Sequence, residues 1–447
     1  MQITIPQNAQ TVISTLAAKG FEANVVGGCV RDALLGTAPH DWDVCTNAEP
    51  AQVEDCFRAF KTFDAGIKHG TVTVVVDGEL IEVTTYRIDG VYADNRHPDR
   101  VSFTKSLAED LARRDFTINA MAYCDKDGIT DPFGGREDLK RGVIRCVGDP
   151  DLRFGEDALR ILRALRFASR LGFSIHYATA ESIHKNAALL NSISAERIRD
   201  ELMGILCGSG AEQILNEYRD VIAVIIPELA ECFDFDQCNK HHVYDVYRHI
   251  TRSVGVSRNH PLIRLTMLLH DIGKPQSCTQ DSDGTKHFKG HQKISADISR
   301  TVLRRLRFSN ITIDNCLRLV LFHDVRFNGS KRLVKRVLNH IGEDNMRLLF
   351  EVQLADLLAQ SDYKREYKLN GVLNAQLQLE EILRQNDCFS LKQLALNGRD
   401  LINAGITDGR QIGKILYFLL DEVIDEKLAN EKNALLARAL EVKDSFV

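Results

Sequence analysis

Sequence patterns typical of strands occur in the first third of this chain and give way to helical patterns after it. This change limits the folds that the chain can adopt. Two β-branched runs, Thr71–Val76 and Leu80–Tyr86, are separated by Asp77-Gly78, a dipeptide typical of two-residue hairpin turns. From Asp149 onward, apolar residues recur at helical spacing and strand patterns nearly vanish. The expected fold class is therefore α/β followed by all-α: a head with a mixed sheet and flanking helices, then a long helical region.

The length of the chain predicts several domains. At 447 residues it exceeds what one ordinary core accommodates, so two to four domains are expected. The segment Asp131-Pro132-Phe133-Gly134-Gly135 indicates a junction after the head. We expect a head at 1–135, a helical neck and body at 136–235, a histidine-bearing helical domain at 236–370 and a helical tail at 371–447.

Bulk composition is that of an ordinary globular protein. Hydrophobic residues make up 44% and charged residues 27% of the sequence, and the formal net charge is -5. This charge excludes a wholly basic nucleic-acid coat but leaves room for a local basic groove. The 11 cysteines include no CxxC pair, which predicts reduced thiols in a cytoplasmic protein. No signal pattern and no apolar run of membrane-spanning length occurs, so no membrane partner is expected.

A glycine turn followed by two closely spaced carboxylates is the most informative motif of the head. Gly27-Gly28 and Arg31 follow the strand pattern Val25-Val26, and Asp41 and Asp43 come soon after. Glycine lets backbone approach a phosphate, and arginine can bind one bidentately. Residues two apart on a strand point the same way, so Asp41 and Asp43 are expected on one strand face. Such paired carboxylates repel each other unless a cation lies between them, and they suit Mg²⁺.

Two interpretations of these acids stay open. An Asp-rich turn at a strand end explains Asp41 and Asp43 without any metal. Alternatively, they bind two metal ions about 3.5–4 Å apart, which would contact the attacking and leaving oxygens of a displacement at phosphorus. A third carboxylate would help to hold the second ion. Glu82 is the nearest candidate by pattern, although an exposed strand glutamate is at least as good an interpretation.

Two further motifs place arginine beside aspartate. In Arg113-Arg114-Asp115, Arg114 suits a triphosphate, and Asp115 suits either a ribose hydroxyl or the N-cap of the following helix-like run. In Glu156-Asp157-Ala158-Leu159-Arg160, helical spacing predicts Asp157 and Arg160 as neighbours on one helix face. A carboxylate and a guanidinium in fixed array can match the Watson–Crick edge of cytosine or adenine. An ordinary solvated ion pair is the alternative.

Basic residues continue along the same predicted helix. They follow at helical spacing and form a stripe suited to triphosphate or RNA backbone: Arg160, Arg163, Arg166 and Arg170. The segment Glu196-Arg197-Ile198-Arg199 is expected to support the site formed by Asp157 and Arg160 rather than to contact the substrate. Another basic cluster, Lys331-Arg332 with Lys335-Arg336, is a candidate RNA contact, which would be tRNA if the resemblance described next holds.

In their order, these motifs resemble those of the polymerase-β-like nucleotidyltransferases. They resemble more closely the class II tRNA nucleotidyltransferase (CCA-adding) and bacterial poly(A) polymerase family. The resemblance runs from about Val25 to Arg199 and continues more weakly to the C-terminus. It implies a polymerase-β-like head followed by an elongated helical neck, body and tail, with the tail binding tRNA.

The resemblance also implies roles for individual residues. Asp41 and Asp43 would be catalytic and bind Mg²⁺, and Glu156 would orient Arg160. Nucleotide would be bound by Gly28, Arg31, Arg114, Asp115, Asp157, Arg160, Arg163 and Arg166, with Asp157 and Arg160 selecting the base. The polar segment between Arg87 and Glu109 is long enough for a mobile loop. In the family the corresponding loop is needed to add the final A.

The histidine-bearing segment carries a second candidate site. Leu268-Leu269-His270-Asp271-Ile272-Gly273-Lys274-Pro275 resembles the HD phosphohydrolases. By this resemblance the metal ligands are His249, His270, Asp271 and Asp356, and His291 and His323 lie between them in sequence. Imidazole and carboxylate ligands suit a second divalent metal such as Ni, Mn or Fe, which can activate water for phosphoester hydrolysis. A retained helical scaffold without turnover is the alternative.

Together these features predict an enzyme that adds or repairs the 3′-terminal CCA of tRNA from CTP and ATP with Mg²⁺. No DNA partner is expected. An A-adding enzyme or a poly(A) polymerase is the alternative within the class. An alternative of another class is an HD phosphohydrolase, in which the HD segment carries the main activity and the head only binds RNA. A non-catalytic RNA-binding scaffold is the least favoured reading.

Overall fold

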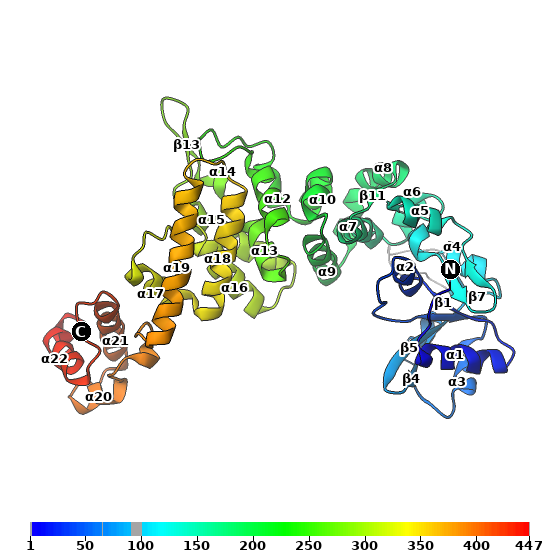
Figure 1. Cartoon of the computed structure of the whole chain (residues 1–447), viewed down its shortest axis with the longest axis horizontal. Helices are drawn as coiled ribbons and strands as arrows, with labels where there is room; N and C mark the ends of the chain where they lie inside the picture. The colour runs from blue at the N-terminus through cyan, green and yellow to red at the C-terminus, as the bar shows by residue number, and fades with distance from the viewer. Residues whose placement is uncertain (1, 65, 91–100, 447) are drawn as a thin grey trace. The chain divides into compact units, whose positions relative to one another are not determined.

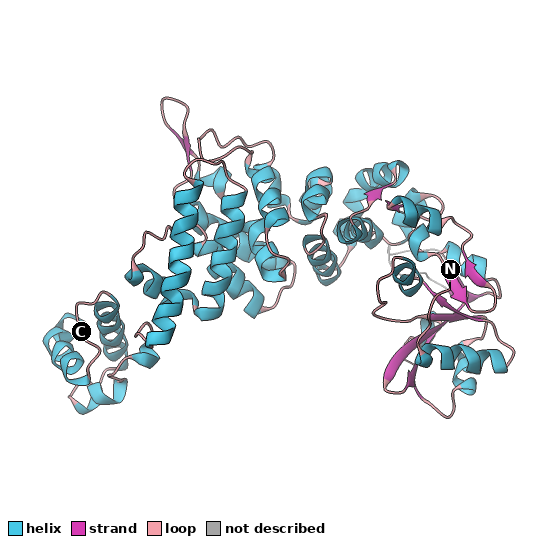
Figure 2. Ribbon diagram, viewed as in Figure 1, coloured by secondary structure: helices cyan, strands magenta, loops and turns pink. Residues whose placement is uncertain are grey.

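The computed structural model describes residues 2–64, 66–90 and 101–446, which form two compact units (Figures 1 and 2). Unit 1 is Met1–Pro227 and unit 2 is Glu228–Val447. The boundary that we expect at residue 235 lies close to this division, and the boundary at residue 135 stays a prediction. The boundary at residue 370 falls within the helix α19 (Arg365–Gln385), and it also stays a prediction.

Unit 1 is built on the mixed sheet that the sequence predicts. Its strand order is β3-β4-β5-β2-β1-β8-β9, with β2 parallel to β5 and the other neighbours antiparallel. The strands of this sheet are β1 (Ala23–Val26), β2 (Val44–Thr46), β3 (Lys61–Phe63), β4 (Thr71–Val76), β5 (Glu79–Thr85), β8 (Ala122–Cys124) and β9 (Gly128–Thr130).

The predicted hairpin is confirmed. Asp77 and Gly78 join β4 to β5, with φ angles of 52° and 85°. Positive φ at both central residues is what the twist of a two-residue hairpin requires. The burial of β4 alternates strictly along the strand, which leaves Val72, Val74 and Val76 in the core.

Helices pack against the sheet, and after β9 unit 1 is mainly helical. Helices α1 and α3 contact β4 and β5, and their apolar residues, such as Val12 and Val53, are fully buried there. The helices of unit 1 are α1 (Gln7–Ala18), α2 (Gly28–Leu34), α3 (Pro50–Cys56), α4 (Leu107–Ala112), α5 (Gly135–Arg141), α6 (Pro150–Glu156), α7 (Leu159–Leu171), α8 (Tyr177–Asn186), α9 (Ala195–Leu206), α10 (Ala211–Glu217) and α11 (Arg219–Ile225). Two short strands that lie between these helices in the sequence, β10 (Val143–Ile144) and β11 (Ser174–Ile175), pair in parallel.

The segment between Arg87 and Glu109 is not one long loop. Strands β6 (Arg87–Asp89) and β7 (Val101–Phe103) pair with each other, and α4 begins at Leu107. Residues 91–100, which form the middle of the predicted mobile loop, lie outside the described residues.

Unit 2 is helical apart from one small hairpin, β12 (Thr279–Gln280) with β13 (Lys286–His287). Its helices are α12 (Val246–Val256), α13 (Pro261–Leu269), α14 (Lys274–Ser277), α15 (His291–Arg305), α16 (Asn310–Phe322), α17 (Lys331–Ile341), α18 (Glu343–Leu358), α19 (Arg365–Gln385), α20 (Gly398–Asn403), α21 (Gly409–Ile424) and α22 (Lys432–Val442). Short 3-10 helices occur in both units: η1 (Ile67–His69), η2 (Thr117–Asn119), η3 (Ala187–Ser192), η4 (Pro227–Cys232), η5 (Leu391–Gln393) and η6 (Lys443–Phe446). No described helix has the length and apolarity needed to cross a membrane.

The tail has its own apolar core, which begins at Cys388 and includes Leu401, Leu419 and Leu435. The basic cluster on α17 is engaged with acids, and the tRNA contact that we expect there stays a prediction. Its four cations form ion pairs with acids that follow in the chain: Lys331 with Glu381 and Asp387, Lys335 with Asp387, Arg332 with Glu426 and Arg336 with Asp425. These charges hold α17 against its neighbouring elements.

Candidate active site

A glycine turn at the end of β1 brings backbone and two arginines together. Gly27 has a φ of 83°, and a Cβ there would lie 2.9 Å from the guanidinium of Arg114. Helix α2 starts at Gly28, so Arg31 lies on this short helix three residues after its start. The Arg31 guanidinium donates to Asn119 Oδ1 (2.7 Å). Only glycine at position 27 combines this backbone conformation with the close approach of Arg114.

Asp41 and Asp43 lie in the segment that leads into β2, and not on a strand as the sequence predicts. The Asp43 carbonyl still accepts a hydrogen bond from the Val26 N–H (3.0 Å), so this residue is held against β1. The side chain of Asp41 is 81% exposed and lies 2.8 Å from His40 Nδ1. Strand alternation does not reach Asp41, because β2 begins three residues after it.

Glu82 joins these acids from the neighbouring strand. Val44 pairs with Val83 in the parallel β2–β5 ladder. Asp43 and Glu82 are the residues directly before this pair, so they lie side by side on neighbouring chain segments. Burial raises the pKa of Asp43 to about 6, Glu82 and Asp41 add to the rise, and Arg114 opposes it. Negative charge is therefore undercompensated here, which suits a divalent cation. The three acids are not a preformed cage, since the described groups with all ligand atoms within 4.8 Å of one another lie in unit 2.

Asp115 is buried and held by an ion pair across the fold. Its Oδ2 accepts two N–H groups from Arg163 (2.9 and 2.7 Å). Burial alone would raise the pKa of Asp115, but the ion pair with Arg163 outweighs burial and lowers this pKa to about 2. The N-cap interpretation of Asp115 is wrong, because the following helix is the short η2, whose N-cap is Phe116.

Asn119 has a role that sequence reasoning missed. Its Oδ1 accepts from Arg31 (2.7 Å), and its Nδ2 donates to Asp115 Oδ1 (3.1 Å). It therefore links the arginine of the glycine turn to the buried aspartate. The available signal was an amide within the otherwise apolar run that follows Asp115.

Asp157 and Arg160 do not share one helix face as the spacing predicts. Helix α6 ends at Glu156, Asp157 is extended (φ -137°, ψ 101°), and α7 begins at Leu159. Asp157 Oδ1 accepts the Leu159 N–H (3.1 Å), which is one of the free N–H groups of the new helix. This short-range bond explains why the helix breaks at an aspartate.

The two residues have separate supports within the described chain. Arg160 is 9% exposed and donates to Glu156 Oε2 (2.6 Å) and to the Arg113 carbonyl (3.1 Å). Asp157 Oδ2 accepts from Arg197 (2.9 Å). The contact between Glu156 and Arg160, and that between Arg197 and Asp157, agree with the supporting roles that the sequence suggests.

The arginine stripe of α7 is mostly charge-compensated. Arg163 pairs with Asp115, and Arg166 pairs with Glu201 (2.6 Å). The guanidinium carbons of Arg31, Arg163 and Arg166 also lie 4.3–5.5 Å from the centre of the Phe167 ring. The stripe is therefore an ordered set of guanidinium groups in a polar network, and Arg170 is its exposed member.

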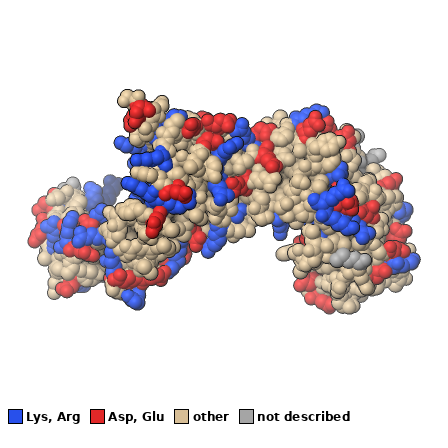
Figure 3. Space-filling view, turned by 45° about the horizontal axis from the view of Figure 1, so that its top comes forward, with Lys and Arg blue, Asp and Glu red and all other residues tan. Residues whose placement is uncertain are grey.

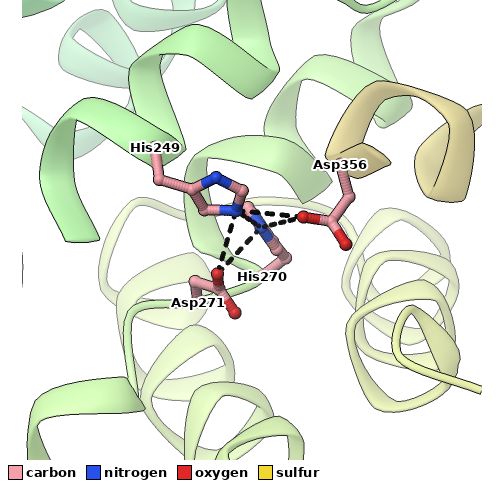
Figure 4. Close-up of side chains that lie close together, drawn as sticks. All are labelled: His249, His270, Asp271 and Asp356. Carbon is pink, nitrogen blue, oxygen red and sulfur yellow. Dashed lines mark hydrogen bonds and ion pairs between the residues drawn. The ribbon is translucent and has the colours of Figure 1, made fainter. Parts of the chain in front are cut away.

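Unit 2 brings all four predicted HD ligands together (Figure 4). His249 Nε2 lies 3.2 Å from Asp271 Oδ2 and 3.0 Å from Asp356 Oδ1. His270 Nε2 lies 3.2 Å from the same Asp271 oxygen. Burial alone would raise the pKa of Asp271, but its histidine and lysine neighbours outweigh burial and hold this pKa well below its usual range. The residues predicted from the HD resemblance therefore converge within one buried cluster.

Known proteins resemble the chain over nearly its full length. Residues 23–145 match the family model of the poly A polymerase head domain. Residues 172–233 match a probable RNA- and SrmB-binding site of polymerase A, and residues 289–439 match a putative tRNA nucleotidyltransferase domain 2. The CCA-adding enzyme of Levilactobacillus brevis is 36% identical over 429 residues, which cover 96% of each chain. The chain belongs to the CCA-adding enzyme family.

Other members of this family agree. The CCA-adding enzyme of Lactiplantibacillus plantarum is 34% identical over 440 residues, which cover 98% of this chain and 97% of that one. The crystal structure of the Bacillus stearothermophilus CCA-adding enzyme in complex with CTP is 29% identical and superposes with a TM-score of 0.70 over 99% of each chain. The predicted α/β head, helical C-terminal region and nucleotidyltransferase activity are thereby confirmed for this CCA-adding family member.

Proposed function

We propose that this nucleotidyltransferase builds or repairs the CCA end of tRNA, taking CTP and ATP as substrates. The observation that carries the proposal is similarity to named CCA-adding enzymes over 96% of the chain. A relative solved in complex with CTP supports CTP as a substrate. An enzyme that acts on tRNA is expected in the cytoplasm, which is where we propose that this protein works. A tRNA 3′-hydroxyl attacks the α-phosphate, and pyrophosphate leaves.

Asp41 and Asp43 are proposed as the catalytic carboxylates that hold Mg²⁺, with Glu82 as a third acid. The pKa of Asp43, which burial raises and which Glu82 and Asp41 raise further, supports this assignment because perturbed carboxylates of this kind cluster at functional sites. When bound, Mg²⁺ would stabilise the attacking and leaving oxygens. The ionised form of Asp43 would be the metal ligand, because protonation of the carboxylate and binding of a cation compete with each other.

The phosphates are proposed to bind at the glycine turn. Gly28 supplies backbone, and Arg31 and Arg114 supply positive charge, with Arg163 and Arg166 adding charge behind them. Arg31 is already positioned by Asn119 (2.7 Å), so little side-chain ordering is needed when nucleotide binds. Asp115, fixed by Arg163, is proposed to accept from the ribose.

Selection between bases is assigned to Asp157 and Arg160. Their separate supports, Arg197 and Glu156, fix a carboxylate and a guanidinium in place before nucleotide binds. A preformed array of this kind discriminates by hydrogen bonding, since the wrong base leaves buried polar groups unpaired. The choice of C and A over G and U would then need no nucleic-acid template.

Incorporation of labelled nucleotide tests the proposal. Transcripts of tRNA that end before the first C, after CC and after CCA are incubated with labelled CTP or ATP and Mg²⁺. We expect two C additions, one A addition and no extension of the complete end. Addition of A alone would favour an A-adding enzyme, and long A tails would favour a poly(A) polymerase.

The pKa of Asp43 predicts how magnesium use depends on pH. With a pKa of about 6, Asp43 is mostly protonated at about pH 5 and ionised at about pH 7.5. Protonation competes with the metal, so the apparent Mg²⁺ affinity should fall by about tenfold for each pH unit below 6. Magnesium titrations of CMP addition across this range measure the effect. A constant affinity throughout would contradict it.

We propose a second function for the HD cluster of unit 2, namely metal-dependent hydrolysis of phosphomonoesters or 2′,3′-cyclic phosphates. The four converging ligands His249, His270, Asp271 and Asp356 favour it. They fit Ni, Mn or Fe better than an all-oxygen site would. Metal content after chelator-free purification, and hydrolysis with added Ni²⁺ or Mn²⁺, test this function.

Variants separate the two proposed functions. Asp43→Asn should slow nucleotide addition by about 10³-fold and leave phosphoester hydrolysis intact, whereas His249→Ala should abolish hydrolysis. Hydrolysis without any nucleotide addition in the unaltered chain would favour the rival in which the head only binds RNA. Absence of both metal and hydrolysis would leave unit 2 as a helical scaffold.

A further inference from the structure

One phenylalanine ring of unit 1 lies against three arginines. The guanidinium carbon of Arg31 lies 5.0 Å from the centre of the Phe167 ring, and those of Arg166 and Arg163 lie 4.3 and 5.5 Å from it. The ring is only 6% exposed. On the face that Figure 3 shows, Lys and Arg side chains of unit 1 lie among Asp and Glu side chains. Phe167 is a partner of a different kind, because an aromatic face attracts cations without carrying a net charge.

The Phe167 ring joins segments that are far apart in the sequence. Phe167 belongs to α7, whereas Arg31 belongs to α2. Phe167 also meets Phe116 edge to face, with the ring centres 5.8 Å apart and the ring planes at 80°. Phe116 is fully buried and directly follows Asp115 in the chain. The Phe167 ring therefore connects the arginine of the glycine turn with the core of unit 1.

Among the three arginines, Arg31 depends most on this ring. The two arginines of α7 each have a carboxylate partner from another segment: Asp115 for Arg163 and Glu201 for Arg166. The carboxylate that Arg31 contacts is that of Asp32, its own neighbour in the sequence. Among the described residues, the contacts that fix the Arg31 guanidinium against the rest of the unit are the hydrogen bond to Asn119 (2.7 Å) and the Phe167 ring.

An aromatic ring can hold a guanidinium without occupying its N–H groups. In Arg31, Nε and Nη2 contact Asp32, and Nη1 donates to Asn119. Each Nη carries two N–H groups, so the guanidinium can still donate to a phosphate oxygen. A carboxylate in place of the ring would neutralise the positive charge and compete for the same N–H groups. The face of the ring fixes the guanidinium and leaves its charge available to a ligand.

We propose that Phe167 is a positioning residue for nucleotidyl transfer, whose ring face holds the Arg31 guanidinium where it binds the triphosphate of the incoming nucleotide. The inference rests on the proposed function, in which Arg31 binds phosphate, and it adds the residue that positions this arginine. A phosphate contact of this kind acts in the ground state and the transition state alike, so loss of the ring should raise KM rather than lower kcat. Because CTP and ATP carry the same triphosphate, the effect should be equal for both.

Stepwise fluorination of Phe167 tests the electrostatic role of the ring. Fluorine withdraws electron density from the ring face and changes the shape of the ring little, so it weakens the attraction for a cation. The full chain is made with mono-, di- and trifluorinated phenylalanine in place of Phe167, and CMP addition is measured over a range of CTP concentrations. We expect the KM for CTP to rise with each fluorine, by about tenfold in total, and kcat to stay within about twofold. AMP addition to a transcript that ends in CC should show the same rise in the KM for ATP.

Phe57 provides the matched control. Like Phe167 it is buried and meets a second phenylalanine edge to face, with the ring centres of Phe57 and Phe60 5.7 Å apart and the planes at 72°. Within the part of the chain that the structure describes, no cation lies over the Phe57 ring. The same fluorine series at Phe57 should leave both KM values unchanged, because it alters only a contact between rings. Circular dichroism with thermal unfolding establishes that each fluorinated protein is folded.

A double-mutant cycle identifies the arginine through which the ring acts. Phe167→Leu should raise the KM for CTP by about tenfold in the otherwise unaltered chain. In an Arg31→Met background the same change should raise this KM by less than about twofold, since the cation that the ring holds is then absent. Effects of the two substitutions that simply multiply would show that Phe167 does not act through Arg31, and would overturn the proposal.

The remaining outcomes distinguish the inference from the function on which it rests. If the unaltered chain adds CMP but fluorination of Phe167 leaves KM unchanged, Phe167 only fills space in the core, and the inference fails while the proposed function stands. A rise in KM for CTP without a rise for ATP would place the effect at the base and would also overturn the inference. An unaltered chain that adds no CMP would overturn the proposed function and the inference together.

Discussion

Asp43→Asn is expected to lower the rate of CMP and AMP addition by about 10³-fold while the chain stays folded. An amide cannot act as a charged oxygen ligand, and metal stabilisation of the transition state contributes several kcal/mol, each 1.36 kcal/mol being tenfold in rate. The substitution also removes an ionisation that burial and Glu82 disfavour, so stability should not fall. Single-turnover incorporation on a transcript ending before the first C measures the rate.

Two positions of β5 provide the matched comparison. Glu82→Gln should reduce incorporation by at least about tenfold, because this carboxylate faces Asp43 from the parallel strand. Glu79→Gln, an exposed glutamate at the start of the same strand, should have no effect. Equal activity of the two variants would remove Glu82 from the site. An Asp43→Asn enzyme that kept more than about a tenth of the rate would require different catalytic residues.

Arg160→Met is expected to remove the preference for C and A over G and U. Each good bidentate contact to a base edge discriminates by about 1–3 kcal/mol, so the ratio of kcat/KM for CTP to that for UTP should fall by up to about 10²-fold. Asp157→Ala should have a similar effect, because it removes the acceptor of the same array. Steady-state incorporation of all four nucleotides into one transcript measures the ratios.

Control variants separate base selection from stability. Arg170→Met changes an exposed arginine of the same helix and should leave the ratios unchanged. Glu156→Gln keeps the guanidinium but weakens its 2.6 Å ion pair, so it should lower kcat/KM with a partial loss of discrimination. If Arg160→Met slowed all four nucleotides equally and left the ratios intact, Arg160 would be structural. Thermal unfolding of each variant checks that the buried residue is not merely needed for folding.

Local patterns predicted the parts of the fold that depend on neighbouring residues. The Asp77-Gly78 turn, the strands beside it and the change to helices all follow from backbone preferences and periodicity. Prediction failed where a single hydrogen bond overrides periodicity. The helix expected through Asp157 breaks because that carboxylate bonds to the Leu159 N–H. Likewise, Asp115 is followed by a 3-10 turn and not by the expected helix.

The sequence by itself determined which functional groups this protein has: the carboxylates at 41 and 43, the glycine turn, the Asp157–Arg160 segment and the HD residues. Their order in the chain was enough to indicate the family. Tertiary structure alone decided which groups meet, such as Asp115 with Arg163 and Asp271 with His291 and His323. Residue type and spacing fix chemistry and local conformation. Contacts between distant segments depend on how buried faces pack, and no local pattern encodes that packing.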